Sequence, residues 1–165
     1  MRRLFLLLPI LLIFSCKDDR VCCSSTFIDI LTVFYAQNEQ GDDLFDPNNP
    51  NYIDINKLRV YDLVNGEEVE RYNPGADIPR GFKTYPPGGS YTKYRMHLFL
   101  NEREKSNRTT TILKWNESDI DIFEAELDRG YNHTYYTKLW VNGTKVFDVS
   151  ESKYEDHVQI FTLQK

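Results

Sequence analysis

Residues 135–149, YYTKLWVNGTKVFDV, carry the clearest structural signal in the chain. Two runs rich in β-branched and aromatic residues, which strands favour, flank Asn142-Gly143. Asn-Gly is the dipeptide typical of a two-residue type I′ turn between antiparallel strands. The pattern therefore predicts a β-hairpin with arms at 135–141 and 145–149.

Strand-like segments recur along the rest of the chain, and Asn65-Gly66 marks a second expected hairpin. Polar or Pro/Gly-rich turns separate these segments, and none has a convincing helical pattern. The first, 26–35, is expected to be mostly buried on both faces. The pattern predicts an all-β fold, an antiparallel β-sandwich of immunoglobulin-like or prealbumin-like type with about eight to nine strands. The expected strands are 26–35, 57–63, 67–72, 91–100, 109–115, 120–127, 135–141, 145–149 and 157–163.

The composition fits one domain with a substantial core. The chain has 165 residues, of which 41% are hydrophobic and 14% aromatic. A net charge of −5 disfavours a nucleic-acid-binding surface. Three Cys and three His leave little material for a metal cluster. Because His97, His133 and His157 lie far apart in the sequence, their spacing assigns no catalytic residue.

The N-terminus has the pattern of an export signal. An apolar run at 4–14 follows two arginines and is too short to span a hydrocarbon core of ~30 Å. Ile13-Phe14-Ser15-Cys16 resembles a bacterial lipobox, although Phe14 is larger than the residue usual there. The resemblance implies a signal peptide at 1–15, palmitate-type lipidation of Cys16, a tether at 16–25 and one domain at 26–165. The alternative is a secreted protein without a lipid anchor, cut near Ser15.

The residues after Cys16 bear on localisation. The position where Asp signals inner-membrane retention holds Lys17. Cys16 followed by Lys17-Asp18-Asp19 looks like the export tag of surface-exposed outer-membrane lipoproteins. The remainder is similar in pattern to small uncharacterised β-sandwich lipoproteins of Gram-negative envelopes. Processing would leave 150 residues with a net charge of −7, so the domain should stand off anionic headgroups while acyl chains anchor it.

Cys22 and Cys23 are adjacent, which allows several states. Neighbouring Cα atoms lie ~3.8 Å apart, below the usual disulfide range, so a vicinal disulfide would be strained. Free thiols, a bridge to another chain, or burial of one thiol as a small hydrophobe are the alternatives.

The long Pro/Gly-rich loop at 79–91 is the leading candidate for ligand binding. It places aromatic residues among cations on an otherwise acidic chain, and such side chains can stack on sugars or a partner protein. The alternative is that these aromatics pin the loop against a sheet edge. The candidate residues are Arg80, Phe82, Lys83, Tyr85 and Tyr91.

Two acidic segments are further candidates. Asp42, Asp43 and Asp46 gather oxygen ligands that could hold a loosely bound calcium ion, the one cofactor candidate, or could serve as turn formers. Asp119 and Asp121 share a face if 120–127 is a strand. They could be a glycosidase acid/base pair or, as the simpler expectation, part of a solvated strand face.

Three functions follow from these observations. The leading hypothesis is a non-enzymatic envelope lipoprotein that binds a partner protein or glycan through its loops. The second is a structural or assembly subunit that pairs through an edge strand. The third is a hydrolase with a carboxylate site.

Overall fold

The computed structural model describes residues 26–151 and 160–165. Within these ranges the chain forms eleven strands, and one short 3-10 turn, η1 (Ile55–Lys57), is the only helical segment. The expectation of an all-β fold is confirmed. The expected signal peptide, lipidation site Cys16, tether and cysteine pair lie outside the described residues. The described part of the chain holds no helix with the length and apolarity needed to cross a membrane.

The larger sheet has seven strands and is built around two hairpins. Asn65 and Asn142 each adopt a positive φ, of 52° and 50°, and each is followed by a glycine with positive φ. Both turns therefore have the type I′ backbone predicted from Asn-Gly. The strand order is β1 (Phe27–Asp29), β9 (His133–Val141), β8 (Ile120–Arg129), β7 (Arg108–Lys114), β3 (Arg59–Val64) and β4 (Glu67–Glu70), with β10 (Thr144–Asp148) also paired to β9.

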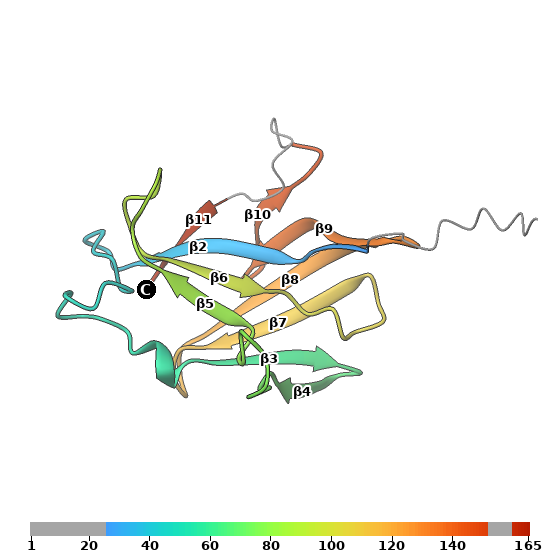
Figure 1. The fold of residues 1–165 in the computed structure, drawn as a ribbon, viewed down its shortest axis with the longest axis horizontal. Coiled ribbons are helices and arrows are strands. Elements are labelled where there is room, and N and C mark those ends of the chain that lie inside the picture. The colour runs from blue at the N-terminus through green and yellow to red at the C-terminus, as the bar shows by residue number, and fades with distance from the viewer. Residues whose placement is uncertain (1–25, 152–159) are drawn as a thin grey trace, which may run out of the picture.

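The smaller sheet lies across the larger one (Figure 1). Its four strands are β11 (Ile160–Gln164), β2 (Leu31–Gln37), β6 (Arg95–Phe99) and β5 (Phe82–Tyr85), in that order. The inner faces of both sheets contribute to one hydrophobic core. Phe34 of β2 is fully buried there, and its ring centroid lies 5.6 Å from that of Phe123 of β8. Aromatic contacts of this kind join the two layers.

The expectation of purely antiparallel sheets is wrong for two pairings. β1 runs parallel to β9, and β11 runs parallel to β2, so both sheets are mixed. The expected count of eight to nine strands is also too low. The segment 26–35 is split into β1 and β2, and the Pro/Gly-rich region expected to be irregular contains β5. Side-chain alternation identifies a strand but not the direction of its partner.

The first predicted strand changes sheets at Ile30. Residues before Ile30 pair with β9 in the larger sheet, and residues after it pair with β6 in the smaller sheet. Ile30 is buried, and its carbonyl oxygen accepts a hydrogen bond from the Leu100 amide. Phe27 and Ile28 are 52% and 54% exposed, so the expectation of burial on both faces fails for β1.

A buried ion pair also links the sheets. Arg71, just after β4, donates from Nε and Nη2 to the two carboxylate oxygens of Asp62 on β3. Its Nη1 donates to the carbonyl oxygen of Phe99 on β6. Asp62 is fully buried, and a Cβ atom placed on Gly81 would overlap the Arg71 side chain. The guanidinium group is therefore packed between the two sheets and links them through its hydrogen bonds.

Candidate functional site

The outer face of the β5–β6 hairpin gathers cations and aromatic rings. Lys83 lies opposite His97, and Tyr85 lies opposite Arg95, in the register of the two strands. Because side chains alternate along a strand, these four share the face that points away from the core. Tyr91 joins them from the β5–β6 loop, which extends beyond the sheet in Figure 1. We call Lys83, Tyr85, Tyr91, Arg95 and His97 the cation–aromatic cluster.

Arg95 is the centre of the cluster. Its Cζ atom lies 3.9 Å from the ring centroid of Tyr91 and 5.5 Å from that of Tyr85. Lys83 Nζ lies 5.2 Å from the Tyr85 centroid, whose ring is 4.4 Å from that of His97. Arg95 Nη1 also donates to the carbonyl oxygen of Pro86 at 3.1 Å. These contacts place the guanidinium group against the Tyr91 ring and close to the Tyr85 ring.

The cluster carries positive charge on a chain whose net charge is −5. Among the described residues, no carboxylate forms an ion pair with Lys83 or Arg95, although several other cations are paired on the surface. Partial burial and the neighbouring Arg95 charge lower the pKa of His97 below its usual value of 6.5. The positive charge of the cluster therefore comes mainly from Lys83 and Arg95.

The structure separates the five predicted ligand-binding residues. Lys83, Tyr85 and Tyr91 come together in the cluster. Arg80 instead donates to the carbonyl oxygens of Asn56 and Leu58 and fixes the end of η1. Phe82 is half-buried and packs against the core. Phe82 therefore packs as the alternative expects of the aromatics, whereas Arg80 has a local structural role at η1.

Two members of the cluster, Arg95 and His97, were missed as candidates from the sequence. Their alternation with buried Met96 and Leu98 was visible, but they lie outside the Pro/Gly-rich loop. The segment FKTY at 82–85 alternates in the same way and pairs with them. A strand assignment at 82–85 would have placed all four outward side chains on one face.

The predicted calcium residues form turns instead of a shared site. Asp43 accepts from the amides of Phe45 and Tyr94, and Asp46 accepts from the amide of Asn48. Asp42 accepts from the side-chain amide of Asn38. No group of three or more His, Cys, Asp or Glu side chains in the described residues is arranged to hold a metal ion. The local bonds are those expected of Asp in turns.

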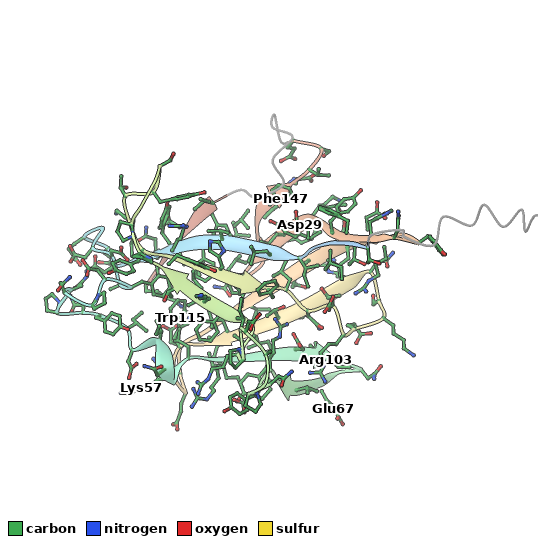
Figure 2. The ribbon with its side chains drawn as sticks, viewed as in Figure 1. Asp29, Lys57, Glu67, Arg103, Trp115 and Phe147 are labelled. Carbon is green, nitrogen blue, oxygen red and sulfur yellow. The ribbon has the colours of Figure 1, made fainter. Side chains whose placement is uncertain are left out.

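Asp119 and Asp121 do lie together, but the expectation of a solvated face is wrong for Asp121. Its side chain is 6% exposed and accepts hydrogen bonds from the indole of Trp115 and the side chain of Asn142, each at 2.7 Å. Lys165 Nζ bridges the two carboxylates at 2.7 Å and 2.8 Å. Both groups are thus engaged in an ion-pair network at the end of the core (Trp115 is labelled in Figure 2).

Comparison with known proteins assigns no family to the chain. No protein-family model, curated protein or solved structure matches the chain. The candidate site therefore rests on its own chemistry. A guanidinium group in contact with two tyrosine rings, with a second cation nearby, is suited to bidentate recognition of carboxylate or phosphate groups.

Proposed function

We propose that this protein is a non-enzymatic lipoprotein, anchored to the outer membrane and exposed at the cell surface, that binds an acidic glycan through the cation–aromatic cluster. Its two-layered architecture is, in this proposal, a β-sandwich of immunoglobulin-like or prealbumin-like type. The shared core of the two sheets supports that assignment. The lipobox-like segment ending at Cys16 supports the anchor.

The position of Arg95 carries the binding proposal. Its guanidinium group contacts two tyrosine rings and has no carboxylate partner among the described residues, on a chain with a net charge of −5. Surface cations of such a chain usually find acidic neighbours, as Lys114 does with Glu68. A sugar ring can contact the exposed part of Tyr91 while its carboxylate pairs with Arg95.

Affinity electrophoresis with polygalacturonate tests the binding proposal, with neutral dextran as the uncharged comparison. We expect the wild-type protein to be retarded by polygalacturonate but not by dextran. Arg95→Gln and Tyr91→Ala should each weaken the retardation at least about fivefold, because each removes one partner of the recognition pair. Arg108→Gln is the matched control, since Arg108 is 57% exposed and stacks on Trp140 of the other sheet. Equal retardation of Arg95→Gln and wild type would contradict the proposal.

The anchor is tested separately. Metabolic labelling with palmitate should modify the wild-type chain and not a Cys16→Ala variant. Unchanged labelling of Cys16→Ala would overturn the lipoprotein assignment without affecting the binding proposal.

One observation favours the second hypothesis, an assembly subunit that pairs through an edge strand. β1 lies at the edge of the larger sheet, and its Phe27 and Ile28 side chains are more than half exposed. The outer edge of an apolar edge strand is a template for another strand. If β1 recruits a partner protein, Ile28→Lys should abolish co-purification of that partner, while Ile122→Lys, on an exposed inner strand, should not.

A further inference from the structure

A cavity of about 370 Å³ opens where the chain crosses from β4 to β5. This volume is in the range of small-molecule sites, ~300–1,000 Å³. Much of the wall is apolar and comes from both sheets and the crossing segment. The apolar lining residues are Ile30, Ala76, Ile78, Phe99 and Leu100.

The polar part of the wall contains two guanidinium groups and a buried carboxylate. Both oxygens of Asp62 accept hydrogen bonds from Arg71. Arg103 is the second cation, and its Nη1 lies 3.8 Å from Asp62 Oδ2, beyond hydrogen-bonding distance. Figure 2 shows Arg103 near β3, to which Asp62 belongs. Asp62 is thus held by the two hydrogen bonds from Arg71, and Arg103 forms only a longer ion pair with it, so the Arg103 guanidinium has hydrogen-bond donors free for a second anion.

The Arg103 guanidinium lines the cavity and is accessible to a ligand. Its side chain is 52% exposed, and no side-chain hydrogen bond from it occurs among the described residues. Its backbone is fixed, because the Arg103 amide donates to the side chain of the fully buried Asn101. Glu102 also lines the cavity but is exposed, so water screens its charge.

We propose that this cavity binds a small amphipathic carboxylic acid, with its apolar body against Ile30, Ile78 and Phe99 and its carboxylate paired with Arg103. The Arg103 guanidinium makes no side-chain hydrogen bond among the described residues, so it favours an anion, and its planar fork matches a carboxylate. A cationic ligand would face two arginines, and of the two carboxylates in the wall, Asp62 already accepts hydrogen bonds from Arg71 and Glu102 is exposed to water. The site is on a different part of the molecule from the cation–aromatic cluster and does not depend on the proposed glycan binding.

Octanoate is a suitable probe, with octanol and octylamine as isosteres of nearly the same shape. In calorimetric titrations of the purified protein, we expect saturable binding of octanoate. Octanol should bind at least about tenfold more weakly, a factor equivalent to 1.4 kcal/mol, and octylamine should be weaker still. Octylamine binding as tightly as octanoate, or no saturable octanoate binding up to about 10 mM, would overturn the proposal.

The variant Arg103→Gln tests whether this guanidinium binds the carboxylate of the ligand. This variant should change the melting temperature little, because the side chain is half exposed and its ion pair with Asp62, at 3.8 Å, is longer than a hydrogen bond while Arg71 remains in place. It should reduce octanoate affinity about tenfold, to the level of octanol, and leave octanol unchanged. Arg108→Gln, at a similarly exposed arginine on the outer face of the larger sheet, should bind octanoate like the wild type. Equal loss in both variants would indicate a nonspecific charge effect and refute the site.

Discussion

Removal of Arg71 should cost more stability than removal of any exposed arginine. Arg71→Ala leaves Asp62 fully buried without the two hydrogen bonds to its carboxylate, and also removes the bond to the Phe99 carbonyl. Breaking a buried pair by deleting one partner costs about 3–5 kcal/mol. Arg103 lies only 3.8 Å from Asp62 and offsets part of this, so we expect about 3 kcal/mol. For a domain of this size, that loss corresponds to a melting temperature roughly 10 °C lower.

Urea denaturation and thermal melting measure this effect, and two controls define its origin. Arg59→Ala breaks an ion pair whose side chains are 39% and 46% exposed, and should cost less than about 1 kcal/mol. The double variant Arg71→Met, Asp62→Leu removes both charges and should be more stable than Arg71→Ala alone by about 2 kcal/mol. A stability loss below about 1 kcal/mol in Arg71→Ala, or a double variant less stable than the single one, would refute the interpretation that Arg71 links the two sheets by neutralising Asp62.

Three further predictions concern packing and titration. Asp121→Ala leaves the Trp115 indole and the Asn142 side chain without their acceptor, and leaves Lys165 paired with Asp119 alone. It should cost about 3 kcal/mol in urea denaturation, and a cost below about 1 kcal/mol would mean that the network is not stabilising. Gly81→Ala, at a φ of +73° and against Arg71, should cost roughly 2 kcal/mol in the wild type and less in the Arg71→Ala background; equal costs would rule out the predicted overlap. Because the pKa of His97 is lowered in the folded state, the imidazole binds its proton more tightly in the unfolded chain. The contribution of neutral His97 to the free energy of unfolding is therefore complete above about pH 6.5, and it is lost as the pH falls through the pKa of the folded state. Proton NMR should give His97 a midpoint below 6.5, and His97→Gln should flatten the stability profile between pH 5 and 7; a midpoint above 6.5 would reverse the sign.

Local sequence signals were sufficient for much of the fold. The Asn-Gly turns require positive φ at two successive residues, and this requirement is met within the dipeptide itself. β5 was missed because its four residues follow a Pro/Gly-rich segment, which masked the alternation of Lys83 and Tyr85. The parallel pairings were missed because the direction of a partner strand depends on chain segments far away in sequence.

The candidate sites were difficult to predict for the same reason, because they depend on contacts between residues far apart in the sequence. Asp121 alternates with Ile120 and Ile122, which are 41% and 42% exposed, so the polar residue faces the core and the apolar ones face outward. This inversion depends on Lys165, a partner 44 residues away, and no local pattern announces it. The cation–aromatic cluster was partly predictable, since three of its members lay in the suspected loop. Arg95 entered only through strand pairing.

The change of sheets at Ile30 has a mechanical consequence. If the chain is tethered at its N-terminus while a ligand holds the β5–β6 hairpin, tension passes along β1, through Ile30, into β2 and then across to β6. Because the hydrogen bonds between β2 and β6 run perpendicular to the strands, a pull along β2 loads them together in shear. Such a domain should resist detachment of its surface ligand by tension better than one whose tether peeled a terminal strand away bond by bond.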